Sequence, residues 1–114
     1  MHNKLVRDKI PDIIFNSGHP APGAFKVVDG IGLQAALINK FDDELKELRL
    51  SLFKELSPDG SDPVIEDLVD VLEIAYSLAE MRGISKEKLD IIRLTKREYH
   101  GGFEHGYIMN TGNK

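Results

Sequence analysis

The sequence contains no cysteine, which excludes disulfide bonds and metal sites built from thiolates. It contains no apolar run long enough to span a bilayer, and its opening residues, MHNKLVRDKIPDII, lack the apolar core of a signal peptide. The formal net charge of −4 gives no general attraction to nucleic acid or to anionic membranes. We therefore expect a cytoplasmic protein that binds neither a nucleic-acid polymer nor a membrane.

The chain is also too short for two domains of ordinary size. At 114 residues it fits a single domain, and its 41% hydrophobic and 30% charged residues are typical of a globular protein. It carries no internal repeat and no low-complexity tract. We therefore predict one domain that spans residues 1–114.

Two long helices are predicted from the spacing of apolar residues. The first covers about 33–56, where one apolar stripe that should be buried recurs at intervals of three and four residues: Leu37, Phe41, Leu45, Leu48 and Leu52. The second covers about 64–82, and its apolar residues surround most of the helix, so it should be buried on more than one side. The turn-forming sequence SPDGSDP separates the two helices and predicts an antiparallel pair.

Shorter elements flank this pair. The segment PDIIFNSG predicts a short helix that begins near Pro11 and ends at Gly18, and residues 19–32 predict a loop with a short extended piece. Gly83 should end the second long helix, and Ser85 should cap a third that runs to about Tyr99. The glycine-rich tail that follows should be irregular.

The predicted fold is therefore an all-α, antiparallel helical bundle. The chain is too short to surround the second long helix completely, so a monomer would expose apolar surface. We expect a second copy to complete the core, in a homodimer or a higher homo-oligomer.

Acidic residues on the two long helices lie at or near their apolar sides. At about 100° per residue, Glu44 borders the apolar stripe, whereas Asp67 falls within the apolar face of the second helix. Glu47 follows Glu44, and Asp70 follows Asp67, by three residues, so each helix carries a side-by-side acidic pair.

Two interpretations of this pattern stay open. The residues are either solvated helix faces, which are common, or one site where four carboxylates converge. A buried carboxylate is costly unless it is paired or bound to a metal, so the position of Asp67 favours a site. Hard oxygen ligands of this kind would bind Mg²⁺ or Mn²⁺.

The same residues carry a family resemblance. The segments ELKE and DLVD resemble the E-x-x-E … E-x-x-D signature of the MazG-like all-α NTP pyrophosphatases. Three further segments, NKLVRDKIP, DVLEIAYSLAEMRGIS and IRLTKREYHGGF, look like a small stand-alone branch of that superfamily, which includes predicted house-cleaning and phosphoribosyl-ATP pyrophosphohydrolase-like proteins. The resemblance extends from Asn3 to about Phe103.

The resemblance implies an enzyme that cleaves a nucleoside triphosphate into monophosphate and pyrophosphate. It implies a Mg²⁺ site (or Mn²⁺) formed by Glu44, Glu47, Asp67 and Asp70. Either Glu44 or Glu47 would be the catalytic residue that activates water. The substrate phosphates would be bound by basic residues near both ends of the chain: Lys4, Arg7, Lys9, Arg93 and Lys96.

Two residues depart from the family pattern. Asp67 stands where the general signature has Glu, and His100 stands where this branch more often has Arg. These departures keep a second hypothesis open, a non-catalytic helical module that binds a nucleotide or a protein. Phosphoribosyl-ATP is a third alternative, as the substrate of a pyrophosphohydrolase.

Overall fold

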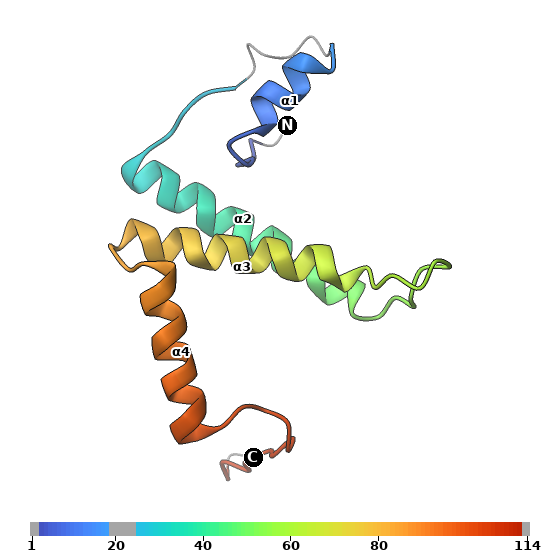
Figure 1. Ribbon diagram of the computed structural model, residues 1–114, viewed down its shortest axis with the longest axis vertical. Coiled ribbons are helices and arrows are strands. Elements are labelled where there is room, and N and C mark those ends of the chain that lie inside the picture. Colours follow the sequence, from blue (N-terminus) through green and yellow to red (C-terminus); the bar gives the residue numbers. More distant parts are fainter. Residues whose placement is uncertain (1–2, 19–24, 113–114) are drawn as a thin grey trace.

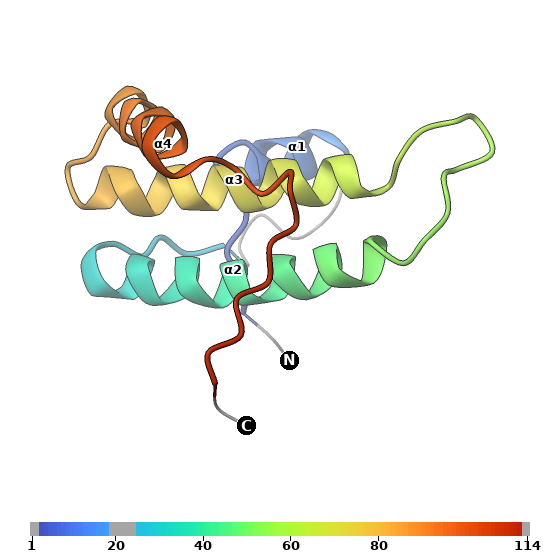
Figure 2. The ribbon, with the colours of Figure 1, turned by 90° about the horizontal axis from the view of Figure 1, so that it is seen from below.

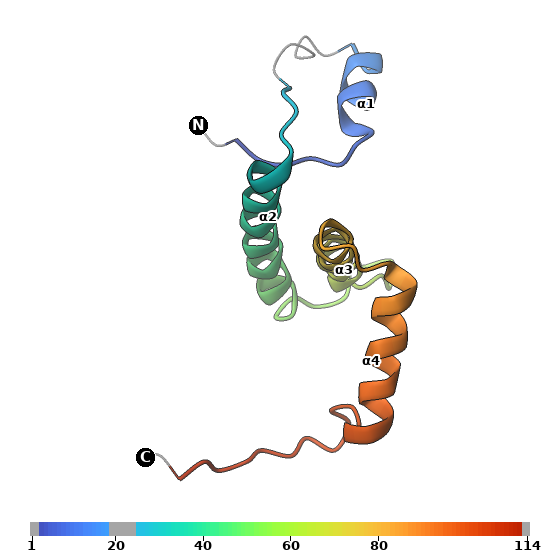
Figure 3. The same ribbon diagram turned by 90° about the vertical axis from the view of Figure 1, so that its left-hand side faces the viewer.

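The computed structural model describes residues 3–18 and 25–112, and all regular structure within these ranges is helical. The helices are α1 (Ile10–Asn16), α2 (Gly30–Ser51), α3 (Val64–Met81) and α4 (Lys86–His100). Helices α2 and α3 run antiparallel and side by side, as Figures 1 and 2 show. Helix α4 leaves this pair crosswise (Figure 3). The all-α prediction is confirmed, and none of the helices in the described ranges has the length and apolar character needed to cross a bilayer.

Helix α2 begins three residues earlier and ends five residues earlier than the apolar pattern predicts. It begins early because Asp29 is extended, with φ −142° and ψ 178°, and its carbonyl accepts a hydrogen bond from the Leu33 amide at 3.1 Å. After Ser51 the chain continues in tighter turns, in which the Phe53 amide donates to the Leu50 carbonyl at 3.2 Å and the Lys54 amide to the Ser51 carbonyl at 3.0 Å. Further on, the Ser57 amide donates to the Ser61 carbonyl at 2.8 Å, and Gly60 has φ 88°. The helical spacing of apolar residues therefore continues past Ser51, where the helix itself ends.

The ends of the other helices follow the predicted signals. Gly83 has φ 76° and lies just after α3, and the Ser85 hydroxyl accepts a hydrogen bond from the Lys88 amide at 3.1 Å at the start of α4. Gly18, with φ 81°, follows α1 in the same way. The predicted loop at 19–32 is only partly described, since 19–24 lie outside the described residues, and 25–29 form neither helix nor strand.

Helix α4 is held to α3 only near its first turns. The Tyr76 hydroxyl donates a hydrogen bond to the Asp90 carboxylate at 2.8 Å, and the Lys86 ammonium lies 5.2 Å from the centre of the Tyr76 ring. From residue 91 onward every side chain of α4 is exposed. Residues 101–112 form no helix or strand, as the glycine-rich tail predicted.

The apolar core of the single chain is small. Among the described residues, Leu37, Ile74 and Ala79 are the only buried apolar residues. The predicted stripe on α2 is wrong at its C-terminal end, because Leu45 is 37% exposed and Leu52 is 63% exposed. Leu52 lies past the last residue of α2, and α3 alone is too narrow to cover the whole stripe.

Candidate functional site

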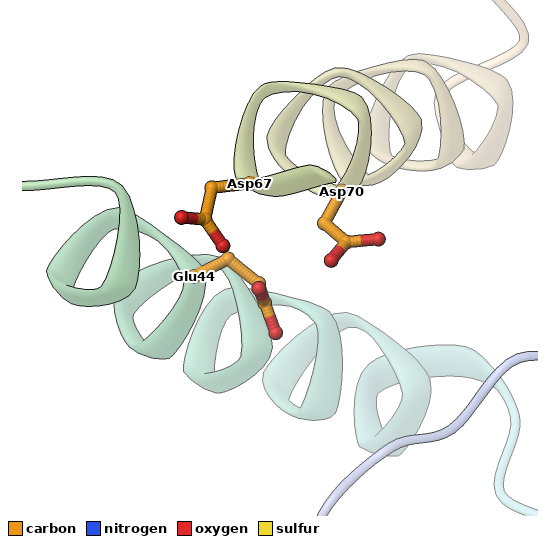
Figure 4. A group of neighbouring side chains, drawn as sticks. All are labelled: Glu44, Asp67 and Asp70. Atoms are coloured by element: carbon orange, nitrogen blue, oxygen red, sulfur yellow. The ribbon is translucent and has the colours of Figure 1, made fainter. Parts of the chain in front are cut away.

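Three carboxylates meet where α2 and α3 pack together. Glu44 from α2 lies opposite Asp67 and Asp70 from α3 (Figure 4), and one carboxylate oxygen of each lies within 4.8 Å of those of the other two. All three residues are half-buried. Asp67 and Asp70 share this side because residues three apart are neighbours on a helix, and the antiparallel packing brings Glu44 to them.

A buried serine holds one of these carboxylates. The Ser51 hydroxyl, in the last turn of α2, donates a hydrogen bond to the Asp67 carboxylate. Ser51 is the only buried polar residue among those described, with 4% exposure. Sequence reasoning missed it, although a serine seven residues after Glu44 lies on the same side of the helix.

Two basic residues neutralise part of the acidic cluster. The Lys40 ammonium lies 3.2 Å from the Glu44 carboxylate, one helical turn away, and the Arg7 guanidinium donates to Asp70 at 2.7 Å. The hydrogen bond with Asp70 raises the pKa of Arg7 above its ordinary value, and the charge of Glu73 contributes in the same direction. Arg7 therefore stays charged, and the cluster of three carboxylates carries two cations beside it.

A cavity of about 510 Å³ lies next to the cluster. It is lined by the segment 5–9, by α2 and by α3, and Asp70 belongs to both the cluster and the cavity wall. Three basic side chains line the same cavity: Arg7, Lys9 and Lys40. Its volume lies within the usual range for sites that bind small ligands, roughly 300–1,000 Å³.

The cavity wall is chemically mixed. Apolar residues from three elements line it together with the charged ones, among them Leu5, Leu37 and Ile74. Glu73 and Glu80 contribute further carboxylates from α3. The cavity therefore offers a ligand both an apolar surface and charges of both signs.

The remaining predicted site residues lie apart from the cluster. Glu47 is exposed on α2 and is not among the three residues whose carboxylates converge. Lys4 is exposed and does not line the cavity. Arg93 and Lys96 are exposed on α4, which runs away from the pair formed by α2 and α3. Within one chain, the structure thus joins three of the four predicted metal ligands with two of the five predicted phosphate-binding residues, Arg7 and Lys9.

Comparisons with known proteins add no family assignment. No family model matches the chain, and no curated protein and no solved structure matches it either.

Proposed function

We propose that the protein is a Mg²⁺-dependent nucleotide pyrophosphohydrolase, which cleaves a nucleoside triphosphate, canonical or not, into monophosphate and pyrophosphate. One observation carries the proposal: three carboxylates from two helices converge within 4.8 Å beside a cavity lined by three basic and four acidic side chains. Acidic and basic groups side by side are what a metal-bound polyphosphate requires. The resemblance of ELKE and DLVD to the MazG-like signature supports the same reaction.

The donor set fits a hard divalent cation. All three side chains offer carboxylate oxygens, which Mg²⁺ and Mn²⁺ prefer, and the described residues provide no nitrogen or sulfur donor to this group. Glu44, Asp67 and Asp70 would hold the ion, with Glu47 one turn further along α2 as the fourth proposed ligand. When bound, the cation would neutralise phosphate oxygens.

The basic residues would bind and orient the substrate. Arg7, Lys9 and Lys40 all face the cavity, and Arg7 can bind a phosphate through two parallel hydrogen bonds. Glu44 or Glu47 would accept a proton from a water molecule while the oxygen of that water forms a bond to the α-phosphorus. The bond between the α-phosphorus and the bridging oxygen then breaks, and pyrophosphate leaves.

The proposed substrate is a free nucleotide, or phosphoribosyl-ATP, which carries the same pyrophosphate leaving group. No base-reading motif is visible in the sequence, so the proposal names the reacting group and leaves the base open. We further propose that the enzyme is cytoplasmic. We propose that it acts as a homo-oligomer, because so few apolar residues are buried among those that the structure describes.

The test is pyrophosphate release from a panel of canonical, deoxy and oxidised triphosphates and phosphoribosyl-ATP, with Mg²⁺ and with excess EDTA. We expect turnover of at least one compound, its loss in EDTA, and a strong decrease in the Glu47→Gln variant. Glu55→Gln, an exposed residue in the loop after α2, is the matched control. Failure to turn over any compound would overturn the proposal, whereas turnover at equal rates by wild type and Glu47→Gln would exclude Glu47 and leave Glu44 as the residue that accepts the proton.

A second function is favoured by the ion pairs of the cluster. Arg7 and Lys40 already pair with two of the three carboxylates, which is also what a purely structural cluster would need. The protein would then be a non-catalytic module that binds a nucleotide or a protein. A thermal-shift titration with Mg²⁺ and a non-hydrolysable triphosphate separates the two functions. The proposed enzyme is stabilised most when Mg²⁺ and the triphosphate are both present and loses that shift in Asp70→Asn, whereas a structural cluster gives a shift with the triphosphate that does not depend on the metal, or none.

A further inference from the structure

Arg7 is the side chain that joins the N-terminal segment to the pair formed by α2 and α3. Its guanidinium donates a hydrogen bond to the Asp70 carboxylate at 2.7 Å. Among the described residues, no other side-chain hydrogen bond or ion pair connects 3–18 with 25–112. Helix α1 packs against none of the other three helices (Figure 3). The position of the guanidinium therefore depends on one carboxylate.

The contact between Arg7 and Asp70 is of a kind that exchanges readily. The Arg7 side chain is 53% exposed and the Asp70 side chain is 34% exposed, and ion pairs that water reaches contribute little to stability. The structure records one hydrogen bond between them, whereas a guanidinium has five N–H donors and can bind a phosphate through two parallel bonds. Asp70 therefore uses only part of what Arg7 can donate.

The charge of the cluster gives a reason for such an exchange. Its three carboxylates and the two cations paired with them, Arg7 and Lys40, leave a net charge of −1. A divalent cation would raise this charge to +1, and departure of Arg7 would then return it to zero. The hydrogen bond with Asp70 is the main cause of the raised pKa of Arg7, so its side chain stays charged. A divalent cation and the guanidinium would therefore repel each other across one carboxylate.

The cavity beside the cluster offers Arg7 a second partner. Arg7 lines this cavity together with Lys9 and Lys40, and Asp70 belongs to the same wall. A phosphate bound in the cavity would meet the three basic side chains, and it would accept hydrogen bonds from Arg7 in place of Asp70. The guanidinium thus lies between a carboxylate of the proposed metal site and the space proposed for the substrate phosphates.

We propose that Arg7 exchanges partners: it binds Asp70 in the free protein, and it turns to a substrate phosphate when a divalent cation occupies the three carboxylates. Arg7 then competes with the metal in the free protein and binds the substrate in the loaded one. Because linkage is reciprocal, the metal and Arg7 weaken each other's binding to Asp70 by the same factor. The inference rests on the proposed function, and it adds the order in which Arg7 makes its contacts.

The first experiment is titration calorimetry of the intact protein with Mn²⁺ alone and with the Mn²⁺ complex of a non-hydrolysable triphosphate. Arg7→Gln should bind Mn²⁺ alone about fivefold more tightly than wild type, which is the most that an exposed ion pair contributes. It should bind the triphosphate complex about tenfold more weakly, because a charge-assisted hydrogen bond is lost. Circular dichroism checks that the variant keeps its helices.

Lys9→Gln is the matched control for the loss of a positive charge. Lys9 lines the same cavity, and the structure records no ion pair for it. Its removal should leave the affinity for Mn²⁺ alone within about twofold of wild type, since a charge without a direct contact is screened by salt. Equal gains in Lys9→Gln and Arg7→Gln overturn the exchange, because any nearby cation would then have the same effect.

The remaining outcomes separate this inference from the proposed function. If Arg7→Gln and wild type bind Mn²⁺ alone equally well, the exchange is overturned, and turnover of a triphosphate still supports the enzyme. Tighter binding of both ligands by Arg7→Gln also overturns the exchange, because Arg7 would then only repel the metal. Absence of Mn²⁺ binding to either protein overturns the exchange as well, and together with absence of turnover it overturns the proposed function.

The second experiment observes the guanidinium itself in the wild-type protein. The Nε–Hε signal of Arg7, assigned by its loss in Arg7→Gln, is followed by NMR as Mg²⁺ and then the triphosphate are added. We expect one shift with Mg²⁺ alone and a further shift with the triphosphate. Arg97, which pairs with Glu104 beyond the end of α4, is the internal control and should shift with neither. An Arg7 signal that Mg²⁺ moves no more than that of Arg97 overturns the proposal.

Discussion

The two sides of α3 differ in what covers them and in what they carry. The side towards α2 combines apolar residues with Asp67 and Asp70, and the same chain supplies the partners of both carboxylates, Ser51 and Arg7. The opposite side of α3 carries an outer stripe of four apolar residues that the same chain leaves about half exposed: Ile65, Leu68, Val69 and Leu72. A buried polar group needs a specific hydrogen-bond partner, and a neighbouring helix can hold that partner in a fixed position. An apolar stripe needs only a complementary apolar surface. The inner side therefore holds charged groups in fixed positions, whereas the outer side leaves apolar surface open.

Removing a charge on the inner side should have the largest effect on activity. We expect Asp67→Asn to lower kcat for pyrophosphate release by about 100-fold or more, since a metal that stabilises phosphate charge contributes several kcal/mol. Asp42→Asn, an exposed change on α2, should leave the rate unchanged. The measurement is a steady-state assay with Mg²⁺ at saturating substrate. If the rate of Asp67→Asn stays within a few-fold of wild type, the carboxylates on the inner side of α3 do not take part in the reaction.

Arg7 tests whether the cavity beside the inner side binds phosphate. We expect Arg7→Ala to raise KM about tenfold, which corresponds to the loss of one charge-assisted hydrogen bond. The thermal midpoint should change little, because the Arg7 side chain is 53% exposed and exposed ion pairs contribute little to stability. Arg7→Lys should recover part of the affinity. A large loss of stability with unchanged KM would instead make Arg7 a structural residue.

Ser51 tests how the inner side holds its carboxylate in position. Ser51→Ala should reduce the free energy of unfolding by about 1–2 kcal/mol, because it removes a buried hydrogen-bond donor. It should also weaken Mn²⁺ binding about tenfold, as changes in residues that orient metal ligands do. Ser51→Thr retains the hydroxyl and should restore the Mn²⁺ affinity. Titration calorimetry with Mn²⁺ and urea unfolding measure the two effects separately.

The smallest expected effect concerns the contact that joins α4 to the outer side of α3. The hydrogen bond to Asp90 raises the pKa of Tyr76 above its ordinary value of 10.0. The folded state therefore favours the protonated phenol, and this stabilisation is fully present below about pH 10 and is lost as the pH rises through the folded-state pKa. Thermal midpoints should fall more steeply above about pH 10 for wild type than for Tyr76→Phe. Parallel pH profiles for the two proteins would count against the contact.

Much of the inner side could be predicted from the sequence. The helical wheel placed Asp67 within an apolar face and Glu44 at the border of another, and both are half-buried and adjacent in the structure. Ser51 and Lys40 were missed, although each follows from spacing alone, as residues seven after and four before Glu44. Their contacts with Asp67 and Glu44 are seen only in the tertiary structure.

Local chemistry along the chain determined the helices and their boundaries. Gly18 and Gly83 ended helices through positive φ, Ser85 began one by accepting an amide hydrogen bond, and the spacing of apolar residues assigned each side of α2 and α3. These signals depend on neighbours within a few residues, so a single sequence contains them in full.

Only the tertiary structure decided which distant groups meet. It brought Arg7 to Asp70 across 63 residues of chain, placed Glu44 and not Glu47 with the two aspartates, and directed α4 away from the cluster. A helical wheel fixes angles around one axis, but the distance between two side chains on different elements depends on how those elements pack. For the same reason the sequence showed that α3 is apolar on two sides, and the packing decided which of them the chain covers itself.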